Sequence, residues 1–415
     1  MDISNFDQIL EKYAELVIEV GLNLQPDQHL IILAGPLEVA PLVRKVVKQA
    51  YKKQSRLVTV IWIDQQIIKI RYQYAPKDSF EEYSSWLSKG ILEWIEEGAA
   101  FLQVWGGDPK AYTDVSPEIL GITNRVRSEN MRPISAHQGI PSMQWNIVCP
   151  PTTSWAKRVF PDDKPKDAVE KLWQAVIKAC RLEEQDPVNF WEIYLEKIRK
   201  RADHLTKKAY QSLMFTGPGT DLEIGLPEGH IWKSGSQNTI KGLPFTANLP
   251  TEEVFTLPHK ERVNGIVSAT FPLNYRGMFI DKFSLRFSEG KVVEYSAETG
   301  KDELGRILDT DENARFLGEV AIVPHKTPIA QSGLIFINTL YDENASNHLA
   351  LGSAFRHNLA GGPAMTKEEF SQAGGNDSMV HVDFMFGSEE MDVDGIFADG
   401  SSEPVIREGE WAFDI

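Results

Sequence analysis

The chain has 415 residues, which is too long for one ordinary hydrophobic core and predicts two domains of roughly 200 residues each. Hydrophobic residues make up 42% and charged residues 25% of it, as in folded globular proteins rather than disordered or fibrous ones. Its formal net charge of −16 argues against a nucleic-acid partner, because a phosphate backbone needs a basic surface. The acidic excess fits a bound divalent cation or, more commonly, a surface adapted to solubility.

The first segment, MDISNFDQILEKYAELVIEV, predicts a folded amphipathic helix. It carries acidic residues where a secretory signal peptide carries basic ones. No apolar run reaches the roughly 18 residues that a membrane-spanning helix requires. Cys149 and Cys180 lack a CxxC pattern and a nearby histidine, which indicates reduced thiols. We therefore expect a cytoplasmic protein without a membrane partner.

The next hundred residues alternate between buried strands and amphipathic helices, which indicates a parallel α/β unit of the Rossmann-like type. Strands are predicted at 29–35, 56–64, 99–107 and 132–140, and helices at 39–54 and 81–98. The turns after the strands contain neither GxGxxG nor a Walker sequence. A scaffold without a bound nucleotide is therefore favoured.

The second half of the chain has a different texture. Residues 165–212 are rich in helix formers with apolar positions three and four apart, which predicts a helical bridge. Short β-like runs separated by Gly, Pro, Asn and Asp follow as far as residue 415. We expect an N-terminal α/β domain with its helical bridge at 1–212 and a β-rich C-terminal domain at 213–415.

A possible metal site begins with the run SMVHVDFMF, which places His381 and Asp383 two residues apart. In a strand both side chains leave the same face, while Val380, Val382 and Phe384 cover the other. An imidazole and a carboxylate suit zinc, cobalt or manganese. A histidine that is merely hydrogen-bonded to its neighbour is the commoner explanation of such a pair.

A second candidate segment, TLYDENASNHLALGSAF at 339–355, brings together Asp342, Glu343 and His348. We expect a polar turn followed by a helix-like LALGSA. Two explanations are equally good for these residues. They can supply ligands, or the acids can favour the first turn of a helix while His348 lies at the surface.

Glu253 and Glu319 stand in unusual settings for carboxylates. Glu253 follows a proline and precedes an apolar Val-Phe pair, and Glu319 interrupts the run FLGEVAIVP. An isolated buried carboxylate is costly, so each is expected to pair with a basic group or a metal ion. The alternatives are an exposed loop acid at Glu253 and, at Glu319, a salt bridge to a residue such as Arg315 or an outward-facing strand position.

Taken in order, the segments NLPTEEVFT, LGEVAIVP, YDENASNHLALGSA and HVDFMFGSEEMDVDG resemble the M29 family of metallo-aminopeptidases, the aminopeptidase T group. The resemblance covers most of the second domain. The first helix, the strand at 29–35 and the helical bridge are also similar to that family's N-terminal domain. Four separate motifs in the same order are far more specific than any one of them.

The resemblance implies a cytosolic exopeptidase that uses two divalent ions (zinc, cobalt or manganese) to release N-terminal residues from short peptides with a free N-terminus. It implies that Glu319 bridges the two ions and that Glu343 completes a coordination shell or acts as a base. The implied metal ligands are Glu253, Glu319, His348, His381 and Asp383. It further implies a homodimer whose sites face an enclosed cavity.

One residue departs from the family pattern. The family has tyrosine after LGSA, whereas this chain has Phe355, which lacks a hydroxyl to steady an oxyanion. Arg356 or His357 could replace that donor, or the metal ions could suffice. A second hypothesis is therefore a metal-binding member with weak or no peptidase activity that binds peptides or acts as a scaffold. A third is a metal-assisted hydrolase of small amides.

Overall fold

We describe a computed structural model of the chain, covering residues 3–275 and 278–415. The chain forms two compact units, one of Met1–Glu192 with Ser236–Pro250, the other of Ile193–Gly235 with Thr251–Ile415. The division expected from the sequence, 1–212 and 213–415, differs from these units in two segments. It assigns residues 193–212 to the first domain and residues 236–250 to the second. Within the described residues, no helix has both the length and the apolar character needed to cross a bilayer.

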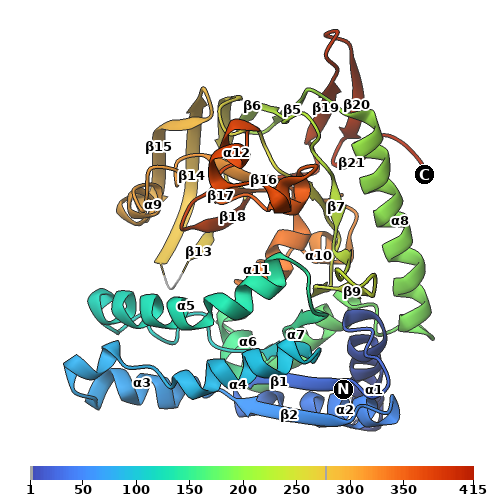
Figure 1. The fold of residues 1–415 in the computed structure, drawn as a ribbon, viewed down its shortest axis with the longest axis vertical. Helices are drawn as coiled ribbons and strands as arrows, with labels where there is room; N and C mark the ends of the chain where they lie inside the picture. Colours follow the sequence, from blue (N-terminus) through green and yellow to red (C-terminus); the bar gives the residue numbers. More distant parts are fainter. Residues whose placement is uncertain (1–2, 276–277) are drawn as a thin grey trace. The chain divides into compact units, whose positions relative to one another are not determined.

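A parallel sheet forms the centre of the first unit, as Figure 1 shows in part. Its strand order is β10-β4-β3-β1-β2, and each neighbouring pair runs parallel. The strands are β1 His29–Gly35, β2 Leu57–Trp62, β3 Ala100–Trp105, β4 Trp145–Val148 and β10 Asn248–Leu249. Three of these confirm the strands predicted at 29–35, 56–64 and 99–107.

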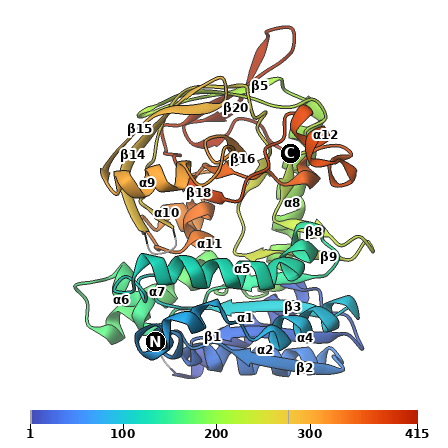
Figure 2. The same ribbon diagram turned by 60° about the vertical axis from the view of Figure 1, so that its left-hand side comes forward.

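Helices account for most of the remaining first unit (Figure 2). Ile31 and Leu33 of β1 share a core cluster with Ile91 of α4 (Ser85–Glu96) and Ile134 of α5 (Pro117–Gly139). Because successive residues of a strand face opposite sides, Leu30 and Ile32, both fully buried, belong to the other face. The helices are α1 Ile3–Leu16, α2 Ala40–Lys52, α3 Gln65–Tyr74, α4 Ser85–Glu96, α5 Pro117–Gly139, α6 Thr153–Val159 and α7 Pro165–Ala179, with a short hairpin of β8 Ser236–Asn238 and β9 Pro244–Thr246.

The strand predicted at 132–140 is wrong, because these residues end helix α5. The buried residues of α5 are Val126 and Ile134, eight positions apart, which lie on one side of the helix. Burial of Ile134 against α4 retains the helix although Pro133 lies inside it. The fourth strand of the chain is instead β4, Trp145–Val148.

The second unit is built mainly from antiparallel strands and begins within α8, Pro187–Lys208. The helical character predicted for residues 165–212 is confirmed by the two helices α7 and α8. The larger sheet has the order β13-β14-β12-β6-β5-β19-β20-β21, with β15 beside β14. Its strands are β5 Ser212–Gly217, β6 Thr220–Gly225, β12 Val263–Ser268, β13 Leu273–Tyr275, β14 Met278–Ser288, β15 Lys291–Thr299, β19 Asp392–Ile396, β20 Ser402–Arg407 and β21 Glu410–Trp411.

A smaller antiparallel sheet of the same unit has the order β18-β17-β16-β11-β7 (Figure 1). Its strands are β7 Lys233–Ser234, β11 Val254–Thr256, β16 Leu317–Ile322, β17 His348–Gly352 and β18 His381–Met385. One face contributes Val320, Leu349, Leu351 and Val382 to a core shared with Leu285 and other residues of the larger sheet. The opposite face is therefore free to present other side chains. Short helices α9 Lys301–Leu308, α10 Pro328–Gln331, α11 Thr339–Asp342 and α12 Lys367–Gln372 complete the unit.

Candidate metal centre

The polar residues singled out in the sequence leave the face of the smaller sheet that points away from the shared core. In β18, Val382 and Phe384 enter that core, so His381 and Asp383 lie on the other face, as predicted. In β17, Leu349 and Leu351 enter the core, so His348 is directed the same way as His381. The prediction of a helix-like structure for LALGSA is wrong, because residues 348–352 form the fully buried strand β17, which lies between β18 and β16.

The pairing of these strands brings two carboxylates to one position of the sheet. Ala350 of β17 is the register partner of Glu319 in β16 and of Asp383 in β18. Directly opposed residues of an antiparallel pair have Cβ atoms about 4.5 to 5.5 Å apart. Ala350 carries only a methyl group. Its side chain therefore leaves the space between Glu319 and Asp383 open.

One group of possible ligands consists of Glu253, Glu319 and His348. His348 Nε2 lies 3.1 Å from Glu253 Oε2 and 3.7 Å from Glu319 Oε1. All three residues are buried. Glu253 reaches this position because it directly precedes β11, whose Val254 pairs with Ile322 at the end of β16.

A second group consists of Glu319, His381 and Asp383. His381 Nε2 lies 3.4 Å from Glu319 Oε2 and 3.3 Å from Asp383 Oδ1. The side chains of His381 and Asp383 are 26% and 17% exposed, so this group is closer to solvent than the first. Glu319 belongs to both groups and directs a different carboxylate oxygen to each histidine.

Both histidines are oriented by backbone carbonyl groups. His348 Nδ1 lies 3.1 Å from the carbonyl oxygen of Ser346, and His381 Nδ1 lies 2.7 Å from that of Ser353. A carbonyl oxygen can only accept, so each Nδ1 carries the donated proton. This hydrogen bond leaves Nε2 of each ring directed at the carboxylates, which is how histidine ligands of metal ions are usually held.

The donor set fits divalent transition metals. It combines imidazole nitrogen with carboxylate oxygen, the ligands that zinc, cobalt and manganese accept in proteins. The three carboxylates also repel one another in a buried setting, and a cation relieves that repulsion. The residues present therefore fit the metal ions that the sequence predicts.

Comparison with known proteins gives this arrangement a family. A sequence model described as thermophilic metalloprotease (M29) matches residues 6–411. The chain belongs to the M29 family of metalloproteases. Both the resemblance seen in the four motifs and the prediction of a metallopeptidase, which is a hydrolase, are thereby confirmed.

Relatives in this M29 family match along their whole length. Aminopeptidase 2 of Geobacillus stearothermophilus is 42% identical over 413 residues, covering 100% of both chains. Aminopeptidase T of Thermus thermophilus is 44% identical, covering 98% of this chain and 99% of its own. The solved structure of wild-type AmpT from Thermus thermophilus matches with a TM-score of 0.93 at 43% identity, over 98% of this chain and 100% of the other.

The carboxylates of the site favour protonated histidines. Burial opposes charge on His348, but its hydrogen bonds and ion pairs with Glu253 and Glu319 raise its pKa well above the ordinary value. His381 is raised in the same way, against burial, by Asp383 and then Glu319. Burial favours a neutral Glu319 as well, yet the two imidazoles outweigh it and lower its pKa to about 2. The site therefore already stabilises positive charge.

Glu343 lies in the short helical turn Glu343–Ala345 that follows α11. Burial, followed by the negative charges of Glu253 and Asp383, raises its pKa well above the ordinary value. Among the described residues, the two ligand groups do not include it. The charges of Glu253 and Asp383 nevertheless act on it, so it lies near the ligands without belonging to either group.

Phe355 lies beside the more exposed ligand group. Its ring centroid is 4.9 Å from that of His381, and it stacks on His357 at 5.4 Å with an interplanar angle of 17°. Of the two residues considered as substitutes for the missing hydroxyl, Arg356 is engaged elsewhere. Its Nη1 donates to the carbonyl oxygen of Met365 at 2.6 Å, and its Nη2 lies 3.5 Å from Asp377.

Sequence analysis missed one residue that holds the ligands in place, Asn344. It is fully buried, and its Oδ1 accepts the backbone N–H of Glu252 at 2.7 Å while its Nδ2 donates to the carbonyl oxygen of Leu340. It therefore ties the segment that carries Glu253 to the segment that carries Glu343. Its place within the YDEN motif was the available signal.

Proposed function

We propose that the chain is a metal-dependent aminopeptidase that releases N-terminal residues from short peptides at a dinuclear metal site. The observation that carries the proposal is the sharing of Glu319 between two ligand groups, one with Glu253 and His348 and one with His381 and Asp383. A carboxylate that serves two ions at once is the arrangement expected of paired ions about 3.5 to 4 Å apart. The names of the M29 relatives support the same activity.

In this proposal Glu253 and His348 would hold one ion, His381 and Asp383 would hold the other, and Glu319 would serve both. Bound ions of this kind polarise the scissile carbonyl group, activate water near neutral pH and bind a free amine. The remaining work falls to the protein. Glu343, a carboxyl group whose pKa is raised by burial and by the charges of Glu253 and Asp383, would move a proton from the attacking water to the leaving amine.

The partly exposed ligand group defines the side from which a peptide enters. Glu253 and His348 are buried, whereas His381 and Asp383 retain some exposure, so the N-terminal residue meets the second group first. A free amine at this position adds positive charge to a site rich in carboxylates. A peptide with a blocked N-terminus lacks that charge.

The experiment is hydrolysis of leucyl-p-nitroanilide by purified protein loaded with zinc, cobalt or manganese, with N-acetylleucyl-p-nitroanilide as the blocked control. Turnover of the free amine alone, with loss of turnover in Glu319→Ala, supports the proposal. Elemental analysis of the same samples supplies the number of bound ions. Equal hydrolysis of blocked and free substrates would instead favour the third hypothesis, a metal-assisted hydrolase of small amides.

Phe355 favours one second candidate, a metal-binding member with weak or no peptidase activity that binds peptides. The ring beside His381 has no hydroxyl to donate to an oxyanion, and loss of one such donor typically lowers turnover about 100- to 1000-fold. Stoichiometric metal without turnover in the native chain, and turnover restored by Phe355→Tyr, would favour this candidate. Ready turnover by the native chain would exclude it.

Three further features follow from the resemblance noted in the sequence. We propose a Rossmann-like first domain, a homodimer and a cytoplasmic location. The parallel order β4-β3-β1-β2 with helices beside it is consistent with the first. Sedimentation equilibrium of the purified chain tests the second.

A further inference from the structure

A pocket opens beside the candidate metal centre, with the ligand Asp383 in its wall. It encloses about 380 Å³ of unfilled space, counting the part open to solvent. Because part of this space is open solvent, the hollow has room for one side chain rather than for a whole peptide. Its lining is mixed, with apolar side chains from Leu273, Phe279, Ile335, Ile337 and Met385 and polar ones from Asn274, Asn338, Thr339, Asp342 and Asp383.

We propose that this pocket binds the side chain of the substrate's N-terminal residue and selects apolar side chains such as leucine. The inference rests on the aminopeptidase function proposed above and specifies its substrate class. It assigns a selecting role to residues outside the ligand set, above all Ile337.

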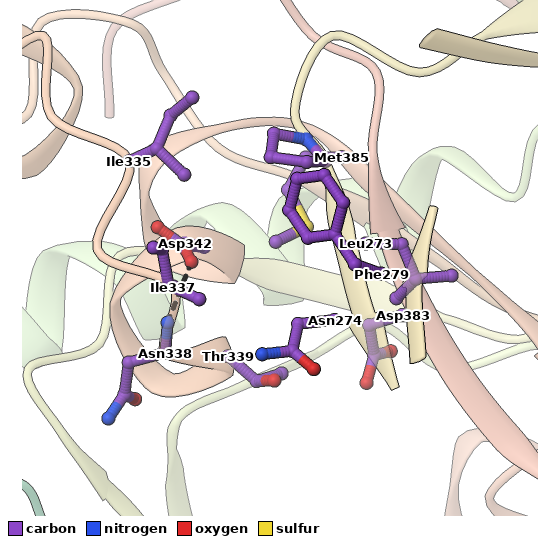
Figure 3. A pocket seen from close by; sticks show the side chains of 11 residues that line it. Leu273, Asn274, Phe279, Ile335, Ile337, Asn338, Thr339, Asp342, Asp383 and Met385 are labelled. Atoms are coloured by element: carbon purple, nitrogen blue, oxygen red, sulfur yellow. Dashed lines mark hydrogen bonds between the residues drawn. The ribbon is translucent and has the colours of Figure 1, made fainter. Parts of the chain in front are cut away.

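The pocket and the ligands share one strand face. Met385 follows Asp383 by two residues in β18, as Asp383 follows His381, so all three side chains leave the same face. Figure 3 shows Leu273 and Asn274 beside Asp383, Phe279 and Met385 further along the pocket, and Ile335 and Ile337 on the side of Asp342. A group bound at Asp383 therefore lies at one end of the pocket, with Leu273 as an apolar neighbour.

The position of the pocket identifies which substrate side chain it receives. In an N-terminal residue, the side chain leaves the carbon that lies between the free amine and the scissile carbonyl group. Both of those groups must lie at the ligands for the proposed reaction. The side chain of this residue must then lie against the ligand set, and the adjoining pocket is lined by Asp383 itself.

The loop that carries Ile335 and Ile337 is held rigidly. Asp342 Oδ1 accepts the backbone N–H of Phe336 at 2.7 Å, and Oδ2 accepts that of Asn338 at 2.9 Å. Phe336 is fully buried and stacks on Tyr341 at 4.9 Å. Asp342 is thus engaged by the backbone, which argues against its serving as the partner of a basic substrate side chain.

Ile337 has an unusual backbone conformation. Its φ is 53°, in the left-handed region that a β-branched residue rarely adopts. Such conformations persist only where their surroundings hold them, and they cluster at ligand-binding sites. Here the two hydrogen bonds to Asp342 hold the loop so that an apolar side chain lies at the pocket, although the backbone of Ile337 is strained. An asparagine or aspartate would fit this backbone better but would make the pocket polar.

The test compares Ile337→Asp with Ile337→Asn and a matched control, Val293→Asp. Aspartate and asparagine tolerate the left-handed region, so both pocket variants should fold, and thermal unfolding verifies this. Val293 is an exposed residue of β15 outside the pocket, so its variant introduces the same charge elsewhere. The substrates are leucyl-, lysyl- and glycyl-p-nitroanilide, which differ only in the first side chain.

We expect the native chain to prefer leucyl over glycyl substrate by roughly 10- to 100-fold in kcat/KM. Ile337→Asp should lose most of this preference and shift toward the lysyl substrate, whereas Ile337→Asn should lose preference without that shift. Val293→Asp should behave as the native chain. An unchanged ratio of leucyl to glycyl kcat/KM in Ile337→Asp would overturn the proposal. So would a set of leucyl dipeptides in which the variant responds only to the identity of the second residue.

A binding measurement separates this proposal from the proposed function. Calorimetric titration of the metal-loaded protein with L-leucine, L-lysine and glycine needs no turnover. Tighter binding of leucine, weakened in Ile337→Asp alone, supports the pocket assignment even in a chain that hydrolyses nothing. Equal binding of all three amino acids would overturn the pocket assignment, even if the chain proves to be an active aminopeptidase.

Discussion

Ala350 lies in cross-strand register with Asp383, and the same alanine is the register partner of Glu319 on its other side. We expect Ala350→Leu to fill the space between the two carboxylates and to prevent metal binding. Overpacking of this fully buried position should also lower the free energy of unfolding by about 1 to 3 kcal/mol. Elemental analysis and urea unfolding measure the two effects. Ala350→Gly is the matched control, and retention of metal by Ala350→Leu would contradict the prediction.

The sharing of Glu319 predicts an unequal effect of two equivalent substitutions. Glu319→Gln keeps the shape of the side chain but removes the charge common to both groups, so we expect it to lose both ions. Glu253→Gln alters only the first group and should retain about one ion. Inductively coupled plasma mass spectrometry counts the metal. Glu389→Gln, at an exposed position, controls for the loss of one charge, and two ions in Glu319→Gln would exclude a bridge.

Metal binding should depend on pH through the two histidines. The carboxylates raise the pKa of His348 and of His381 well above the ordinary value, against burial, so in the metal-free chain both carry protons that an ion must displace. The affinity for metal should therefore rise as the pH rises. Calorimetry in buffers of different ionisation enthalpy measures the protons released. No proton release near neutral pH would contradict the assignment of these imidazoles as ligands.

The same shifts predict how the metal-free chain responds to alkali. Because both histidine pKa values are raised by folding, their contribution to stability is fully present below the unfolded value of about 6.5 and is lost as the pH rises through the folded values. We expect the urea midpoint of the metal-free protein to fall above neutral pH. The double substitution His348→Gln with His381→Gln should reduce this fall. An unchanged dependence of the urea midpoint on pH in the double variant would contradict the prediction.

Asn344 offers a test of how the ligands are positioned. Asn344→Ala leaves the buried backbone N–H of Glu252 without its acceptor, which should cost about 1 to 3 kcal/mol of stability. It should also weaken metal binding, because Glu253 is the next residue. Asn344→Asp keeps an acceptor oxygen and should retain more metal than Asn344→Ala. Equal metal content in the two variants would show that this hydrogen bond does not position the site.

Local periodicity predicted those parts of the site that lie on strands. His381 and Asp383 alternate with apolar residues, so their common face followed from the sequence, and the setting of Glu319 indicated a buried carboxylate with a partner. The motifs then supplied the order of the segments. What the sequence could not provide was the register that places Ala350 between Glu319 and Asp383, because strand pairing depends on contacts between distant segments.

Errors arose where tertiary packing outweighs local preference. The run LALGSA contains good helix formers, but pairing with strands on both sides makes residues 348–352 a buried strand. Conversely, Pro133 disfavours a helix, yet Ile134 packs against α4 and the helix continues. Loop positions such as Asn344 and Ile337 carry no periodic signal. Their roles depend on a hydrogen bond and a backbone angle that only coordinates show.

The return of Ser236–Pro250 to the first unit has a consequence for biosynthesis. Strand β10, Asn248–Leu249, completes the parallel sheet by pairing with β4, although a stretch of the second unit is translated before it. Until Leu249 has emerged from the ribosome, the edge of β4 in the nascent sheet remains unpaired. An unpaired strand edge can pair with another chain and promote aggregation. A fragment that stops at Glu192 would carry the same unprotected edge permanently.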